Sequence, residues 1–177
     1  MLAITRMGSV AIGILVGLVL AVILLKAANQ NHKMKTEYDE RQKIIRGKAY
    51  QIAWYVMVIY EVLMMVLHIG EISLPVSEYV LHFGGVLVSA IVLAVYCIWK
   101  DVYWGLNSNR RRYSIIFLAT GLLNAIPVYF SAKEGTLFAN GETGPQLVNL
   151  MVLIMLVVLG ITLIAKDAAD RNAGREG

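Results

Sequence analysis

One acidic side chain stands alone inside a long apolar stretch. Glu61 lies in the run from residue 49 to residue 70, which holds no other lysine, arginine, aspartate or glutamate. A carboxylate deep in an apolar helix is expensive when it is ionised, so such a residue is kept neutral, paired or functional. Two interpretations are open. Glu61 is either the titrating group of a proton-carrying or ligand-binding site, or a protonated acid that holds helices together by hydrogen bonds.

Two further polar residues lie at a similar depth in their own apolar runs. Ser89 is near the middle of residues 79–99, and Asn124 is near the middle of residues 113–132. If these runs are helices that pack together, the three side chains meet at one level and can share hydrogen bonds. We therefore expect an intramembrane polar site made of Glu61, Ser89 and Asn124.

A second set of polar residues brackets the short connection that contains Pro75. His68 and Glu71 are three positions apart before it, and Glu78 and His82 are four apart after it. Each spacing places its two residues on one face of a helix, and a short turn would bring the two helices together antiparallel. Two imidazoles and two carboxylates suit zinc or another divalent metal. They also suit a pH-responsive hydrogen-bond cluster, or ordinary residues at a water interface.

No catalytic motif is present in the sequence. No serine, cysteine or aspartate lies in a recognisable nucleophile motif, and no glycine-rich phosphate loop follows a strand. The one cysteine, Cys97, excludes an internal disulfide and a zinc site built on several thiolates, and we expect it to be a packing residue. The sequence therefore predicts a protein that is not an enzyme and binds no cofactor.

The elements that carry these residues follow from the composition. The chain has 177 residues, 58% hydrophobic and 16% charged, whereas a soluble domain is about half apolar and about a quarter charged. A helix that crosses a bilayer needs roughly 20 mostly apolar residues. Nothing here shows the alternation of a membrane barrel. We predict an all-α polytopic membrane protein, a single five-helix bundle with spans at about 7–25, 49–70, 79–99, 113–132 and 147–165.

The positive charges predict an orientation for these five spans. Fourteen lysines and arginines fall in the connections on one side, and two fall on the other. By the positive-inside rule, the N-terminus is outside and the C-terminus is cytoplasmic. The net charge of +4 is then explained by topology. We therefore expect no nucleic-acid partner.

The longest polar stretch, residues 26–48, is expected on the cytoplasmic side. Residues 36–46 are predicted to form an amphipathic helix that either lies on the inner surface or runs into the second span, with Gly47 as a bend. This segment is either a connector that anchors to anionic lipid or a docking surface for a cytosolic partner. The docking residues would be Asp39, Arg41 and Arg46.

Two cytoplasmic segments resemble those of a known group of proteins. The first reads Asp39-Glu40-Arg41-Gln42 and then Ile45-Arg46-Gly47-Lys48-Ala49; the second includes Lys100-Asp101, Gly105-Leu106-Asn107 and Asn109-Arg110. In these motifs the chain resembles uncharacterised small integral membrane proteins of Gram-positive bacteria. The resemblance implies a multi-pass protein of the bacterial plasma membrane. It carries no activity and no functional residue over to this chain.

Two main classes of function remain, and a membrane enzyme that acts on a lipid is a distant third. The first is a non-enzymatic plasma-membrane protein that acts through partners, as an accessory, regulatory or immunity-type subunit docked on its cytoplasmic face. The second is a small proton-coupled transporter or channel, built as a homo-oligomer, with Glu61 at its centre. The lipid bilayer is a partner in both. The absence of a catalytic motif and the small size favour the first class.

Overall fold

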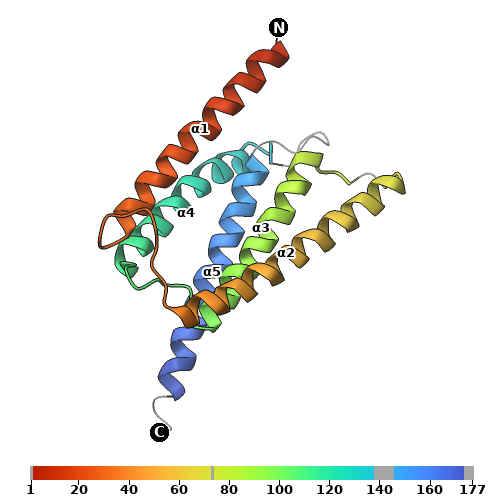
Figure 1. Cartoon of the computed structure of the whole chain (residues 1–177). Coiled ribbons are helices and arrows are strands. Elements are labelled where there is room, and N and C mark those ends of the chain that lie inside the picture. Colours follow the sequence, from red (N-terminus) through yellow and green to blue (C-terminus); the bar gives the residue numbers. More distant parts are fainter. Residues whose placement is uncertain (1, 73, 138–145, 174–177) are drawn as a thin grey trace. The chain divides into compact units, whose positions relative to one another are not determined.

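A computed structural model describes residues 2–72, 74–137 and 146–173 of the chain. Within these residues the regular structure is helical, and no strand forms beyond an isolated bridge between Asn29 and Ser108. Each of the five helices is long and apolar enough to cross a membrane (Figure 1). The predicted all-helical class and the five candidate spans are therefore confirmed. The helices are α1 (Leu2–Ala28), α2 (Glu40–Ile69), α3 (Glu78–Trp99), α4 (Arg110–Lys133) and α5 (Gln146–Ala173).

The described chain divides into two compact units. Residues 2–38 and 105–116 form the first unit, and residues 39–104 and 117–173 form the second. In the second unit, α3 packs against both α2 and α5, and the three helices lie side by side (Figure 1). A small core of Ala49, Cys97 and Val102 lies where α2 meets the end of α3. Cys97 is 1% exposed, in agreement with the packing role predicted for it.

Most large apolar side chains lie on the outside of the helices. Ile59 is 68% exposed, Leu122 67% and Ile164 72%. A water-soluble fold would bury side chains of this size, because each gains about 1.5–3 kcal/mol from leaving water. The apolar surface of these helices is therefore suited to a hydrocarbon environment.

The start of α2 decides between the two arrangements predicted for residues 36–46. Asp39 is the N-cap: its Oδ1 accepts a hydrogen bond from the Gln42 backbone N at 2.6 Å, while Gln42 Oε1 accepts one from the Asp39 N at 3.2 Å. This reciprocal capping box begins the helix at Glu40, and α2 then continues through Gly47 to Ile69. The segment 36–46 is thus not a separate surface helix. From Glu40 onward it forms the first turns of α2, which is the second of the two arrangements predicted for it.

The first unit is held by side-chain amides. Asn29, Asn31 and Asn107, called the amide cluster below, join the connection after α1 to the loop before α4. Gly105 belongs to the same loop, and a β-carbon at this position would collide with the Thr36 side chain. A glycine is therefore needed where the two segments approach each other.

Candidate functional site

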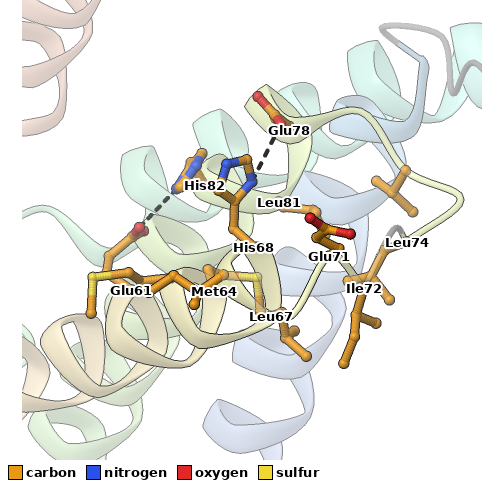
Figure 2. A pocket seen from close by; sticks show the side chains of 13 residues that line it. Glu61, Met64, Leu67, His68, Glu71, Ile72, Leu74, Glu78, Leu81 and His82 are labelled. Carbon is orange, nitrogen blue, oxygen red and sulfur yellow. Dashed lines mark hydrogen bonds and ion pairs between the residues drawn. The ribbon is translucent and has the colours of Figure 1, made fainter.

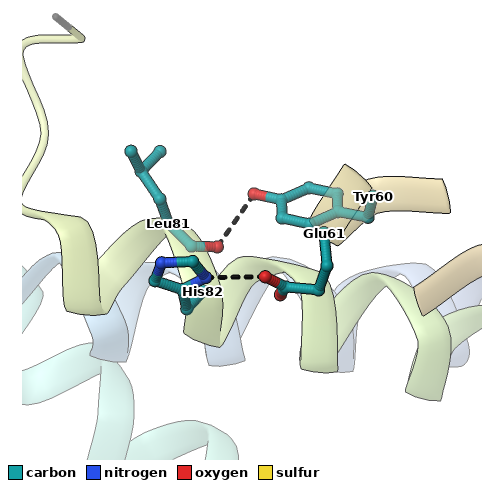
Figure 3. Close-up of polar contacts among 4 residues, drawn as sticks. All are labelled: Tyr60, Glu61, Leu81 and His82. Atoms are coloured by element: carbon teal, nitrogen blue, oxygen red, sulfur yellow. Dashed lines mark hydrogen bonds and ion pairs between the residues drawn. The ribbon is translucent and has the colours of Figure 1, made fainter. Parts of the chain in front are cut away.

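The shortest contact of Glu61 is with a histidine on the neighbouring helix. Glu61 lies in the second half of α2 and His82 lies in the first turns of α3. His82 Nδ1 is 2.7 Å from Glu61 Oε2, which is the distance of a strong hydrogen bond (Figure 3). Glu61 is therefore paired with His82. No lysine or arginine lies in any predicted span to pair with it.

Two glycines on α3 make room for this contact. A β-carbon at Gly85 would lie 2.6 Å from Tyr60 Cδ1 and 3.0 Å from Glu61 Oε1. At Gly84 it would lie 3.0 Å from the Tyr60 hydroxyl oxygen. These distances are shorter than ordinary carbon contacts of about 3.5–4.0 Å. Residue 61 can therefore reach α3 because the facing surface of α3 carries no side chain at Gly84 and Gly85.

Tyr60 adds a second link between the same two helices. Its hydroxyl donates a hydrogen bond to the Leu81 carbonyl oxygen at 2.8 Å, one residue before His82 (Figure 3). Tyr60 is partly buried, and this bond holds its ring against Gly84 and Gly85. The two consecutive residues of α2 thus hold two consecutive residues of α3, which sets the register between the helices.

The pair borders a cavity of about 900 Å³ between α2, α3 and their connection (Figure 2). This volume lies in the range of about 300–1,000 Å³ that is typical of small-molecule sites. The cavity has three carboxylates and two imidazoles on otherwise apolar walls. The polar groups belong to Glu61, His68, Glu71, Glu78 and His82, and the walls include Met64, Met65, Leu67, Ile72 and Leu81.

The four residues that bracket the α2–α3 connection do not form one set of ligands. His68 Nδ1 lies 3.9 Å from Glu78 Oε1, whereas His82 contacts Glu61, and Glu71 lines the cavity without joining either pair (Figure 2). Among the described residues, no group of three or more histidines, cysteines or acids is placed to hold a metal ion. The sequence predicted that all four residues meet in one cluster, but Glu71 lies beyond the end of α2 at Ile69 and so does not share a helix face with His68. The pairs form between helices instead, because facing side chains approach each other more closely.

The predicted hydrogen-bonded site of Glu61, Ser89 and Asn124 is not formed. The Ser89 hydroxyl donates to the Val86 carbonyl oxygen at 2.9 Å, and Asn124 Nδ2 donates to the Thr120 carbonyl oxygen at 2.8 Å. Both side chains thus bond to the backbone of their own helix. Small polar side chains readily find a carbonyl three or four residues earlier, so equal depth in a membrane does not bring them to a common partner.

Two of the three predicted docking residues serve the fold itself. Asp39 caps α2, and Arg46 donates to the Val102 carbonyl oxygen at 3.1 Å and to the Tyr50 hydroxyl at 3.3 Å. Arg41 lies in the first turn of α2 and is exposed. The docking surface stays a prediction, and Arg41 is the residue of the three whose replacement leaves the described contacts intact.

Sequence reasoning missed three residues of the site. Tyr60 was expected either to pack or to line an aromatic pocket below Glu61, and Gly84 and Gly85 were not singled out. A signal for them exists: two adjacent glycines follow His82 by two and three positions inside an apolar run, where small residues let helices approach. Two adjacent glycines close to a histidine therefore indicate a place where an acidic residue on another span can approach that histidine.

No protein-family model, curated protein or solved structure matches this chain. The interpretation of the cavity consequently rests on its own geometry. The resemblance of residues 39–49 and 100–110 to membrane proteins of Gram-positive bacteria stays a prediction.

Proposed function

We propose that the protein is a small proton-coupled transporter or channel of the bacterial plasma membrane, with its N-terminus outside and its C-terminus in the cytoplasm. Five apolar helices and the unequal division of fourteen against two basic residues support this placement. In this orientation the α2–α3 connection and the cavity beside it face the outside of the cell. The cavity is then the entrance through which protons reach the Glu61–His82 pair.

One observation carries the proposal: the 2.7 Å contact between His82 Nδ1 and Glu61 Oε2 at the wall of a cavity that holds a second His–Glu pair. With one shared proton, the Glu61–His82 pair has no net charge, as imidazolium with carboxylate or as imidazole with carboxylic acid. Loss of that proton leaves a net charge of minus one, and gain of another leaves plus one. Each step therefore changes the charge at the cavity wall.

The exposure of the pair gives each change of charge a consequence. In the chain alone, 38% of the Glu61 side chain and 60% of the His82 side chain are exposed. A net charge that faces hydrocarbon is expensive, so the charged forms need water, a ligand or a second copy of the chain against them. The neutral form does not. Proton binding thereby changes what can occupy the cavity, and this links proton movement to the movement of a ligand.

Other titratable groups face the same space. His68, Glu71 and Glu78 line the cavity, whereas the Tyr60 hydroxyl donates to the Leu81 carbonyl oxygen and Tyr60 is not part of the cavity wall. The His68–Glu78 contact is longer, 3.9 Å, and both side chains are 80% exposed. This outer pair is suited to collecting protons from water, because it is solvated, and the inner Glu61–His82 pair is suited to holding them.

The test uses purified protein in lipid vesicles that contain the pH-sensitive dye pyranine. A pH gradient is applied, and potassium with valinomycin clamps the membrane potential. Wild-type protein is expected to dissipate the gradient at least about tenfold faster than Glu61→Gln, which keeps the size of the side chain but cannot bind the exchanged proton. Glu134→Gln is the matched control, since it changes an exposed acid at the end of α4 and should behave as wild type.

Two results would refute the proposal. One is a Glu61→Gln protein that dissipates the gradient as fast as wild type. The other is a wild-type protein that dissipates the gradient no faster than empty vesicles do at any pH tested. In either case, action through a partner becomes the better hypothesis. Exposed Arg41 is the observation that favours it, and co-purification with and without Arg41→Ala tests it.

A further inference from the structure

Basic side chains gather on the first unit where α1 ends and α4 begins. Glu37 is the one acidic residue of residues 2–38 and 105–116. Against it stand six exposed cations at the last turn of α1, in the connection that follows, and in the first turn of α4. These six form the basic platform: Lys26, Lys33, Lys35, Arg110, Arg111 and Arg112.

The amide cluster fixes the backbone that carries the two central lysines. Asn107 Oδ1 accepts a hydrogen bond from the Glu37 N at 2.8 Å, and its Nδ2 donates to the Lys35 carbonyl oxygen at 3.1 Å. Asn29 is fully buried and donates through Nδ2 to the Lys33 carbonyl oxygen at 2.8 Å. The lysines therefore project from a backbone held by buried amides, so little backbone freedom is lost when a ligand binds.

The last turn of α1 is bound directly to the first turn of α4. The Asn109 N donates to the Ala28 carbonyl oxygen at 3.2 Å, and an Arg112 guanidinium nitrogen donates to the Ala27 carbonyl oxygen at 3.1 Å. Two segments about eighty residues apart in sequence are thus brought together. The charge of Lys26 and the charges of the arginines add at one surface, not at two separate connections.

The first turn of α4 places positive charge where a helix normally favours negative charge. It contains three consecutive arginines and no acid, and the first turn of a helix is the positive end of its dipole. The Arg112 N–H of this turn already donates to Asn109 Oδ1 at 3.1 Å, so the groups that can donate to the phosphate oxygens of a bound anion are the arginine guanidinium groups. A bound anion would offset the positive charge gathered at this end of the helix. The platform is therefore suited to an anionic ligand.

The surfaces beside the platform tell which anionic ligand fits. Leu24 and Leu25, just before Lys26, are 42% and 40% exposed, and Ile115, just after the arginines, is 59% exposed. Cations thus border bare apolar helix surface on the same unit. We propose that the basic platform binds the phosphate head groups of anionic membrane lipids, whose acyl chains lie along α1 and α4. This lipid site involves neither Glu61 nor His82.

The test compares lipids at the surface of the full-length protein in phosphatidylcholine membranes. Electron paramagnetic resonance of spin-labelled phosphatidylglycerol and spin-labelled phosphatidylcholine gives the relative association of each lipid. Wild type is expected to prefer phosphatidylglycerol, and Lys33→Gln with Arg111→Gln is expected to lower this preference about tenfold. Lys43→Gln with Lys48→Gln is the matched control, since it removes two exposed cations from α2 and should keep the preference.

Two further measurements separate lipid binding from the alternative explanations. The swap Lys33→Arg with Arg111→Lys keeps every charge and is expected to keep the preference, which shows that charge is what the first variant lost. Glycerol 3-phosphate at millimolar concentration should not displace the lipid; displacement would identify a site for soluble phosphates and overturn the proposal. It is also overturned if the Lys33 and Arg111 variant retains the preference, or if the control loses as much.

Discussion

Replacement of Gly85 by alanine tests the helix contact on which the Glu61–His82 pair depends. The new methyl group would lie 2.6 Å from Tyr60 Cδ1, 2.9 Å from Tyr60 Cε1 and 3.0 Å from Glu61 Oε1. A tyrosine ring cannot bend, so the whole ring has to retreat by roughly 1 Å to reach an ordinary carbon contact. That movement also pulls the Tyr60 hydroxyl from the Leu81 carbonyl oxygen, which it contacts at 2.8 Å.

The expected magnitude follows from three contributions. Overpacking of this kind costs about 1–3 kcal/mol, and the weakened hydrogen bond costs about 0.5–1.5 kcal/mol. Alanine recovers about 1 kcal/mol because it is a better helix former than glycine. The net loss in the free energy of unfolding is therefore about 0.5–3.5 kcal/mol. Gly47→Ala is the matched control: it also lies within a helix, but a β-carbon there meets nothing within 4 Å, so it should stabilise by up to about 1 kcal/mol.

The chain supplies its own reporter for the measurement. Its one cysteine, Cys97, is 1% exposed in the core of the second unit, so a maleimide dye that fluoresces on thiol addition reports unfolding during heating in detergent. For a chain of this size, about 2–4 °C is expected per kcal/mol. Gly85→Ala should therefore melt roughly 1–14 °C below wild type, and Gly47→Ala should not.

A second substitution separates the steric clash from other effects. Tyr60→Leu removes the ring that the new methyl group meets, so adding Gly85→Ala to Tyr60→Leu should cost much less than adding it to wild type. If Gly85→Ala melts as high as Gly47→Ala, or if its cost is unchanged in the Tyr60→Leu background, then the close approach of α2 and α3 is not what limits this position.

Two further substitutions test the other contacts that shape the chain. Asn107→Ala removes three hydrogen bonds of the amide cluster, which is expected to cost about 2 kcal/mol locally and to speed hydrogen exchange at the Glu37 amide roughly thirtyfold; unchanged exchange would contradict the role of the cluster. Asp39→Ala removes the N-cap of α2 and should cost about 1 kcal/mol. Faster exchange should then be confined to the first turn, and equal exchange at the Gln42 amide would count against the capping box.

The five apolar runs were predictable because each combines about 20 apolar residues with charges at both ends. The helix ends were not. α2 begins at Glu40, nine residues before the predicted span, because backbone hydrogen bonding does not stop where the apolar surface stops. α5 likewise continues to Ala173 beyond the predicted end at residue 165, where Lys166–Asp170 and Arg171–Asp167 pairs, each 2.6 Å, support the added turns. Hydropathy locates the membrane boundary, whereas capping and charge pairs locate the helix boundary.

The partner of Glu61 could not be predicted from the sequence, for a different reason. Counting depth from the nearest charged residues assumes that neighbouring helices end at the same level. Glu61 lies eight residues before the end of α2, and His82 lies four residues after the start of α3, which correspond to about 12 Å and about 6 Å along the two axes. If the pair is level, α2 therefore extends about 6 Å past the start of α3. Depth counting separates two residues that this offset brings into contact.

The offset has its cause in pairwise packing, which no single helix displays. Tyr60 can lie against α3 only where α3 lacks side chains, at Gly84 and Gly85, and its hydroxyl then reaches the Leu81 carbonyl oxygen. Once this contact forms, His82 is the polar residue beside Glu61. The position of a glycine pair on one helix and a tyrosine on the next thus decides whether an acid in an apolar helix has a titratable partner. In this chain the Glu61–His82 contact therefore depends on Gly84 and Gly85, two residues that cannot bind or release a proton themselves.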